Sequence, residues 1–310
     1  MEFVVSGEAL IDLVPAGPAA DTFQSMWKGL SAGGPMNTAI GLARLAESVQ
    51  FAGRLSDDLF GRQLQAHLRA NGVGLDFAIR TDDPTSLAVV SLGEGRAASY
   101  AFHLDGTANF GWQPDELPAT TEAQWVHVGS LATVIRPGAA VLMDWADRHP
   151  GALSLDINVR PSVIADPHDY WTRVEPWLEV LGARSGVVKA SDEDVAFLAE
   201  ASGVEGTPTR VMAQWWERFG FSVGVVTLGP EGGYAIDDSG ADAFVPGRVV
   251  EVVDTVGAGD TFMAGFLSEY AATGRLGAAL TQGVTAGAYV CARQGPQPPT
   301  RAELETFARA

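Results

Sequence analysis

Short β-rich runs alternate with helical stretches along the whole chain, and this alternation limits the fold more than any other feature of the sequence. The strand-like runs lie at residues 3–6, 49–53, 124–128, 152–156, 185–189 and 222–228. Stretches with helical periodicity separate them, most clearly at residues 36–46, 59–70, 137–148, 210–219, 261–272 and 276–293. Such alternation is typical of α/β proteins, in which helices cross over between parallel strands. The sequence therefore predicts a three-layer α/β/α sandwich with a mainly parallel central sheet.

Two segments, residues 13–31 and 85–110, do not follow this alternation. The second contains two runs with a period of two residues, at 86–91 and 96–102, on either side of a Gly-Glu-Gly turn. Such runs are typical of antiparallel strands with one exposed face. We predict a small β-sheet lid inserted into a single domain of residues 1–310. A substrate or a second copy, in a homodimer, would cover its exposed face, and an ordinary surface hairpin is the alternative.

The charge balance narrows the range of partners. The 310 residues include 38 acidic and 20 basic side chains, which gives a net charge of −18. Nucleic acids and anionic membrane surfaces require basic patches, so we expect neither as a partner. An anionic substrate would need local dipoles, a metal ion or a few well-placed cations.

The distribution of apolar residues bears on the cellular location of the protein. No apolar run reaches the roughly 18 residues of a membrane helix, and a strand-like run rather than an apolar leader opens the chain. We therefore expect a cytoplasmic protein. Its single cysteine, Cys291, leaves no internal disulfide to form.

The most informative short motif is DTVGAGDT at residues 254–261, directly before a helical stretch. Gly257 and Gly259 permit positive φ and expose consecutive N–H groups at a helix start, which suits an anion-binding nest. Asp260 lies inside it and, at a helix N-terminus, is expected to keep a low pKa, yet it could take a hydroxyl proton late in phosphoryl transfer. The spacing fits neither a Walker loop nor a dinucleotide-binding loop. Alternatively, Asp254 and Thr255 simply cap the helix.

A second motif, AGGPMNTA, occupies residues 32–39. Gly33 and Gly34 precede a predicted helix, where glycines often serve geometry alone. Asn37 offers both a donor and an acceptor, which suits sugar hydroxyl groups. Asp12 follows a predicted strand at the lid boundary and could accept two hydroxyl hydrogens.

The two motifs, in this order, resemble those of the ribokinase-like carbohydrate kinases, also called the phosphofructokinase B family. The N-terminal signature matches Gly33, Gly34, Asn37, Gly41 and Gly53, and the C-terminal one matches Asp254, Thr255, Gly257, Ala258, Gly259, Asp260 and Gly265. The resemblance extends from residue 7 to about residue 299. It is strongest to bacterial fructokinases, at GEALID (7–12), GRLSDDLFG (53–61), DINVRP (156–161) and VTLGPEG (226–232). It implies a ribokinase-like fold and an ATP-dependent kinase that phosphorylates a primary hydroxyl group of a monosaccharide.

The resemblance implies roles for individual residues. Asp260 would take the proton from the sugar hydroxyl, while the N–H groups of Gly257, Ala258, Gly259 and Asp260 hold the developing negative charge. The sugar would contact Asp12, Gly33, Gly34 and Asn37, with His103 and Arg160 as further candidates. The nucleotide would contact Lys189, Thr227, Gly229 and Gly232, and the purine would pack near residues 283–292.

Two cation sites are also implied. ATP chemistry implies Mg²⁺, which is mostly held by water and few carboxylates. Many family members carry Asn-x-x-Glu where this chain has Ser191 and Asp194, so Asp194 is a candidate for a water-mediated Mg²⁺ contact or, alternatively, part of a helix cap. A K⁺ site of the family would use Asp254 and the carbonyl group of Val256.

The lid sequence bears on the substrate. Related kinases often have Phe/Tyr-Tyr-Arg where this chain has Phe102, His103 and Leu104. Without that guanidinium an acid sugar such as 2-keto-3-deoxygluconate loses a natural partner, so fructose is our first choice, ahead of ketodeoxygluconate, ribose and nucleosides. Arg160 could still contact a substrate anion or pair with an acid, and His103 could be a solvated strand residue. Two other classes of function remain: a protein that senses a sugar or nucleotide without turnover, and a hydrolase.

Overall fold

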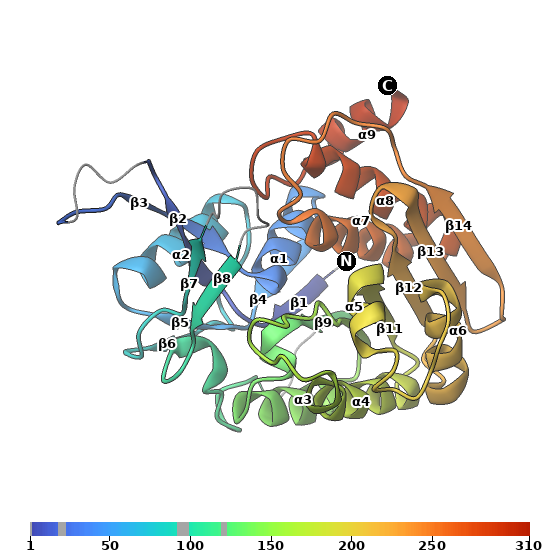
Figure 1. The fold of residues 1–310 in the computed structure, drawn as a ribbon, viewed down its shortest axis with the longest axis horizontal. Helices are drawn as coiled ribbons and strands as arrows, with labels where there is room; N and C mark the ends of the chain where they lie inside the picture. Colours follow the sequence, from blue (N-terminus) through green and yellow to red (C-terminus); the bar gives the residue numbers. More distant parts are fainter. Residues whose placement is uncertain (1, 18–22, 92–98, 119–122) are drawn as a thin grey trace.

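The computed structural model describes residues 2–17, 23–91, 99–118 and 123–310, and its main feature is one large sheet (Figure 1). The strand order is β14 (Asp242–Pro246), β13 (Gly232–Asp237), β12 (Val223–Thr227), β11 (Val187–Ser191), β10 (Ala152–Asp156), β9 (Trp125–Gly129), β1 (Glu2–Ser6) and β4 (Ser48–Phe51). The strands from β12 to β4 are parallel, and β13 and β14 are antiparallel additions. The predicted mainly parallel sheet is confirmed, and all six predicted strand runs belong to its parallel part.

Helices cover both faces of this sheet. One face carries α1 (Gly34–Arg44), α7 (Ala258–Thr273) and α8 (Leu276–Cys291), with α2 (Leu59–Ala70) and α9 (Arg301–Arg309) beside them, and the other carries α3 (Gly138–Arg148), α4 (Pro167–Ala183), α5 (Asp192–Leu198) and α6 (Pro208–Phe219). Each layer has its own apolar core. Alternation along β1 supplies both cores, because Phe3 and Val5 belong to the first and Val4 belongs to the second. The predicted three layers are confirmed.

A small separate sheet projects beside the body (Figure 1). Its order is β3 (Trp27–Ala32), β2 (Leu10–Pro15), β7 (Leu87–Ser91) and β8 (Ser99–His103). The predicted small sheet is confirmed, although β2 begins before residue 13 and pairs with β7 in parallel, so the sheet is mixed rather than antiparallel. The predicted Gly-Glu-Gly turn lies outside the described residues. A two-stranded ribbon of β5 (Arg54–Ser56) and β6 (Ile79–Thr81) completes the strands that the structure describes.

Within the described ranges, no helix is both long enough and apolar enough to cross a bilayer.

Candidate active site

Asp254 closes the loop that precedes α7. One of its carboxylate oxygens accepts the N–H of Val256 at 3.0 Å, and the other accepts the N–H of Gly295 at 3.0 Å. Gly257 takes the N-cap position with φ of 77°, and a Cβ there would lie 2.5 Å from the Cβ of Pro296. Only glycine meets both conditions. Because no described side chain caps α7, the helix-capping alternative for this loop is wrong.

The first turn of α7 leaves backbone N–H groups without partners. No described residue accepts a hydrogen bond from the N–H of Gly257, Gly259 or Asp260. The N–H of Ala258 instead donates to the carbonyl of Thr255 at 3.2 Å, and its predicted contact with the transferred phosphate stays a prediction. The unpaired groups lie at the positive end of a 16-residue helix, an arrangement that suits an anion.

Asp260 is buried where α1 and α7 meet. Asn37 Nδ2 donates to one carboxylate oxygen at 2.8 Å, and Asn158 Nδ2 donates to the other at 3.3 Å. Burial raises the pKa of Asp260, and the hydrogen bond from Asn37 and the charges of Lys189 and Arg160 oppose this rise. The expected low pKa is therefore wrong, because lost hydration outweighs the helix dipole and the donors. A carboxylate with a raised pKa accepts a proton more readily near neutral pH.

The glycine pair before α1 makes room for these contacts. Gly33 has φ of 131°, and a Cβ there would lie 2.5 Å from the carbonyl oxygen of Glu8. At Gly34, a Cβ would lie 2.9 Å from Asn158 Nδ2 and 3.2 Å from Asp260 Oδ1. Both glycines are therefore needed for the close approach of α1 to the base.

The N–H groups of Gly257, Gly259 and Asp260 form the nest. Beneath it, the central sheet carries a buried ion pair. Lys189 Nζ donates to the two oxygens of Asp156 at 2.8 and 3.1 Å, and their side chains are 3 % and 4 % exposed. The ammonium lies 3.1 Å from where a Cβ of Gly259 would be. Burial raises the pKa of Asp156 to about 7, although the charge of Lys189 opposes this. Lys189, predicted to contact the nucleotide, thus lies behind the nest rather than on an open surface.

Arg160 lies beyond the carboxyl end of β10. Its Nη1 donates to the side-chain oxygen of Asn158 and to the backbone carbonyls of Asn158 and Val159. Pairing of Arg160 with an acid is not observed in the described part of the chain. Asn158 was not among the predicted site residues, although its place directly after a strand in the DINVRP motif was a signal for it.

Asp12 faces the same space from the small sheet. Its register places it beside Ala88, which in turn pairs with Phe102, so these three share one face. Burial raises the pKa of Asp12 to about 6, and the charge of Arg160 opposes the rise. The charge of Arg160 acts on both Asp12 and Asp260, so the cation lies within electrostatic reach of both carboxyl groups, and the sugar contacts of these residues stay a prediction.

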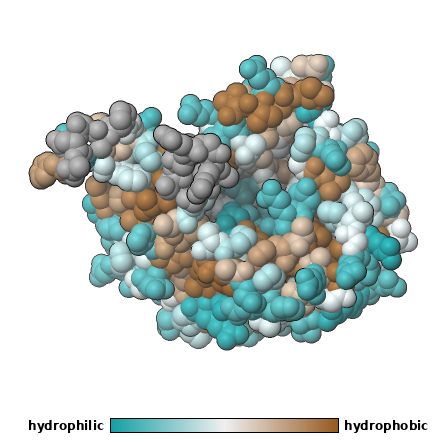
Figure 2. Space-filling model, viewed as in Figure 1, coloured by the Kyte–Doolittle hydropathy of each residue, from teal (hydrophilic) through white to brown (hydrophobic). Residues whose placement is uncertain are grey.

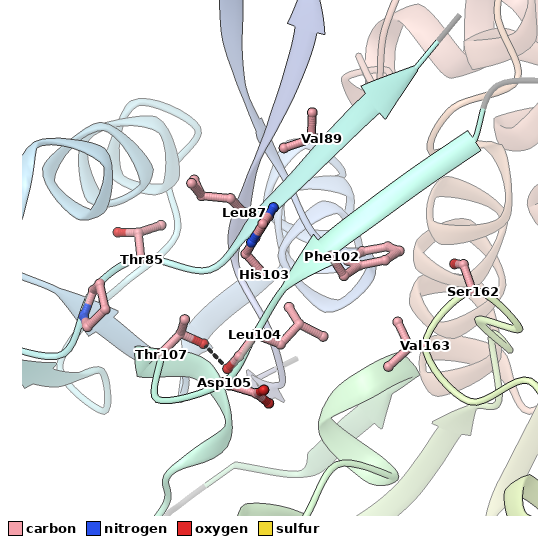
Figure 3. Close-up of a pocket in the computed structure, with 11 residues that line it drawn as sticks. Thr85, Leu87, Val89, Phe102, His103, Leu104, Asp105, Thr107, Ser162 and Val163 are labelled. Carbon is pink, nitrogen blue, oxygen red and sulfur yellow. Dashed lines mark hydrogen bonds between the residues drawn. The ribbon is translucent and has the colours of Figure 1, made fainter. Parts of the chain in front are cut away.

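His103 lies apart from this group. It pairs with Leu87 and is exposed on the opposite face of the small sheet from Phe102. A cavity of about 580 Å³ surrounds this strand, and Figure 3 shows Phe102 and Leu104 directed towards Val163 while His103 lies beside Leu87. Strand alternation places His103 and Asp12 on opposite faces of the small sheet, which favours the solvated-strand alternative, and a sugar contact of His103 stays a prediction.

The predicted nucleotide residues Thr227, Gly229 and Gly232 lie at or just after the carboxyl end of β12. Thr227 pairs with Ser191 of β11. Both therefore lie at the carboxyl ends of their parallel strands, close to Lys189 of β11. At Gly232, φ is 111° and a Cβ would lie 2.0 Å from the carbonyl oxygen of Val245, so only glycine fits.

An exposed apolar segment leads from β14 to the nest. Val249, Val252 and Val253 are 102 %, 63 % and 58 % exposed. Hydrophobic side chains gather in several patches on the face drawn in Figure 2, one of them along its upper edge. Exposed apolar side chains beside a polar site offer a flat surface for an aromatic ligand group.

Asp194 forms a helix cap. Its oxygens accept the N–H groups of Ser191 and Val159, each at 2.7 Å, and Ser191 returns a capping hydrogen bond. The capping alternative for this motif is confirmed. No cluster of three or more metal-ligating side chains occurs among the described residues.

Comparison with known proteins supports the family resemblance of the two glycine motifs. The model of the pfkB family of carbohydrate kinases matches residues 2–303. The chain is 34 % identical to a fructokinase of Rhizobium leguminosarum bv. trifolii over 84 % of this chain and 77 % of that protein. It is 32 % identical to a fructokinase of Klebsiella pneumoniae, over 87 % and 84 %.

Solved structures agree in fold. A fructokinase of Xylella fastidiosa with bound ATP has a TM-score of 0.85 and 25 % identity, covering 99 % of this chain and 98 % of that one. A fructokinase of Vibrio cholerae O395 with fructose, ADP and calcium has a TM-score of 0.83 and 26 % identity, with the same coverage. The chain belongs to the pfkB family of carbohydrate kinases.

Proposed function

We propose that the protein is an ATP-dependent kinase that transfers the γ-phosphate to a primary hydroxyl group of a monosaccharide, with fructose as the first candidate. One observation carries the proposal. Asp260, held on both oxygens by amide donors, lies in the same helix turn as unpaired N–H groups and above a buried lysine. A base and an anion site are thus side by side, which is what phosphoryl transfer to an alcohol requires.

The residues divide the reaction between them. Asp260 accepts the hydroxyl proton as attack on phosphorus acidifies it, a contribution of about 10²–10⁴ in rate. The N–H groups of Gly257, Gly259 and Asp260 hold the negative charge that develops on the transferred group, and the Lys189 ammonium beneath them adds to their effect. Asp12 and Asn37 orient the sugar so that its hydroxyl meets Asp260.

The substrate class follows from the charges around the sugar space. Asp12 is an acceptor for neutral hydroxyl groups, whereas a substrate carboxylate beside it would be repelled. Leu104 offers no charge to an acid sugar. The named relatives are fructokinases, and one neighbour was solved with fructose. These points favour fructose over 2-keto-3-deoxygluconate, with ribose and nucleosides as further alternatives.

The nucleotide would lie along the edge of the sheet next to the nest. Thr227, Gly229 and Gly232 are placed to contact it, and the valines before the nest offer a surface for the purine. Mg²⁺, when bound with ATP, would neutralise phosphate charge, and Asp194, whose oxygens each accept one backbone N–H, is a candidate for a water-mediated contact with it.

Two further roles belong to this proposal. Asp254 and the carbonyl of Val256 would contribute to a K⁺ site beside the nest. The small sheet would form a homodimer contact, because Trp27 and Leu30 of β3 are 44 % and 48 % exposed. Sedimentation of the protein at several concentrations tests the dimer, and a Leu30→Glu variant should shift it towards monomer.

A panel of sugars with ATP and Mg²⁺, scored by ADP release, tests the function. Fructose should give the highest kcat/KM, and ketodeoxygluconate, ribose and a nucleoside serve as comparison substrates. Binding of nucleotide without turnover of any sugar would instead favour a sensor protein. The Asp260→Asn variant tests the base, because it keeps the size of the side chain, but its amide has only one acceptor oxygen and cannot take the hydroxyl proton.

A further inference from the structure

Asn158 joins three parts of the site. Its φ is 45°, a left-handed conformation that asparagine tolerates better than most residues with a side chain. Its Nδ2 donates to Asp260 Oδ1 at 3.3 Å, and its Oδ1 accepts from Arg160 Nη1 at 2.5 Å. A Cβ at Gly34 would lie 2.9 Å from this Nδ2, so the glycine leaves room for the amide.

We propose that Asn158 is a positioning residue, which Arg160 locks in one amide orientation so that it holds the carboxylate of Asp260 for proton transfer. This proposal rests on the proposed kinase function. It assigns Arg160 a role within the site, through Asn158, in place of a direct bond to an acid.

The orientation of the amide follows from hydrogen-bond chemistry. A guanidinium group only donates, so Arg160 can bond the oxygen of the Asn158 amide and not its nitrogen. A flipped amide would turn its NH₂ group towards Arg160 and its oxygen towards the carboxylate of Asp260. Both contacts would then be repulsive. Arg160 therefore ensures that a donor faces Asp260.

Asn158 and Asn37 act on different oxygens of the base. Asn37 donates to Oδ2 at 2.8 Å, and Asn158 donates to Oδ1. Two donors on two oxygens fix the rotation of the carboxylate about its Cβ–Cγ bond. Each oxygen keeps a lone pair, and the fixed rotation decides which one meets the sugar hydroxyl.

A purely structural role of Asn158 would predict different contacts of its side chain. If Asn158 were present only for its left-handed backbone, glycine would meet that need better and the amide would need no specific partners. Instead both ends of the amide have charged partners from two other positions in the fold.

The charges around Asp260 determine the sign of the expected pH effect. Lys189 from β11 and Arg160 from the segment after β10 stabilise its ionised form, while Asp156 of β10 is neutralised in part by its pairing with Lys189. The amide of Asn158 also favours the ionised form. Loss of this donor should therefore raise the pKa of Asp260 and move the acid limb of the rate profile to higher pH.

The test is Asn158→Gly, which removes the amide and keeps the left-handed backbone. The matched control is Ser185→Gly, since Ser185 also has a positive φ, of 49°, and lies on the surface before β11. For fructose, ATP and Mg²⁺, Asn158→Gly should lower kcat about ten- to hundredfold with a smaller change in KM, and should move the acid limb upward. Ser185→Gly should leave both unchanged, and both variants should remain folded, because glycine adopts the left-handed backbone without strain.

Two further measurements keep the proposal separate from the proposed function. A carbon-13 NMR titration of the Asp260 carboxyl group, assigned by its loss in Asp260→Asn, requires no turnover and should show a higher apparent pKa in Asn158→Gly. In a double-mutant cycle, Arg160→Met should cost less in the Asn158→Gly background than in the wild type.

The outcomes are distinct. Absence of sugar turnover in the wild type would refute the kinase function, and the titration would still judge Asn158. Wild-type kcat, acid limb and titration in Asn158→Gly would overturn the positioning role. An equal cost of Arg160→Met in both backgrounds would overturn the lock by Arg160.

Discussion

Replacement of Lys189 by methionine tests how the chain keeps charge beneath the nest. Lys189 and Asp156 are almost completely buried and lie 2.8 Å apart, so removal of the cation leaves a buried carboxyl group without its partner. Loss of one partner of such a pair costs roughly 3–5 kcal/mol while the other stays charged. With a pKa of about 7 in the wild type, Asp156 is mostly neutral at pH 5, where Lys189→Met should cost little.

The cost should then grow with pH. In the variant the pKa of Asp156 rises further, because the charge that opposed its desolvation is gone. Above pH 7 the wild-type carboxyl group ionises and the variant's does not, so the unfolding constants of the two proteins should diverge by at most about tenfold per pH unit. The divergence continues until the variant's carboxyl group also ionises. Urea unfolding followed by tryptophan fluorescence at pH 5, 7 and 9 measures this difference.

A double variant separates stability from chemistry. Lys189→Met with Asp156→Asn removes both charges and should recover most of the stability lost at pH 9. It should not recover turnover, because no cation then lies behind Gly259. Equal destabilisation of Lys189→Met at pH 5 and pH 9 would refute the reasoning, as would wild-type turnover in the double variant.

Three other changes test the sugar site. Asp260→Asn should leave sugar and ATP binding nearly intact and lower kcat by about two orders of magnitude or more, as measured by calorimetry and ADP release; near-normal turnover would remove Asp260 as the base. Gly34→Ala places a methyl group 2.9 Å from Asn158 and should reduce kcat about tenfold or more with little change in melting temperature. Because the pKa of Asp12 is about 6, the KM for sugar should rise as pH falls through 6, and Asp12→Asn should abolish this dependence.

The local sequence pattern predicted the parallel strands and their main helices better than the irregular helices and the antiparallel strands at one edge of the sheet. Parallel strands buried on both faces have a strong apolar signal, and all six were found. The helices α4 and α9 and the strands β13 and β14 were not predicted, and α5 was predicted only by its cap at Ser191. α4 contains Pro176 in its interior and α5 has only 7 residues, so neither gives an extended periodic pattern. The antiparallel strands β13 and β14 lie at one edge of the sheet and interrupt the strand–helix alternation on which the prediction relied.

The same limits apply to the site. Glycine positions and the Asp260 carboxylate were evident because turns and helix starts constrain sequence locally. The burial of Lys189 was not, since it depends on Asp156 from the neighbouring strand. The raised pKa of Asp260 likewise depends on how closely α1 approaches α7, which local sequence does not report. The exposure of His103 agrees with the solvated-strand alternative, but which face of the strand it occupies depends on register, which local sequence does not fix.

The convergence of α1 and α7 resolves the difficulty that a net charge of −18 presents for an anionic substrate. A methyl group at Gly41 would lie 2.6 Å from Ala264 Cβ, so small residues let the two helices pack closely and bring their N-terminal ends to one place. Both ends carry positive partial charge, and Lys189 and Arg160 add two full cations there. Asp156, Asp194 and Asp260 oppose these cations at close range, whereas exposed acids on the surface are screened by solvent and salt over about 10 Å. The field that an incoming phosphate meets at the nest is therefore set by these few local groups, and the net charge of the chain is a poor guide to it.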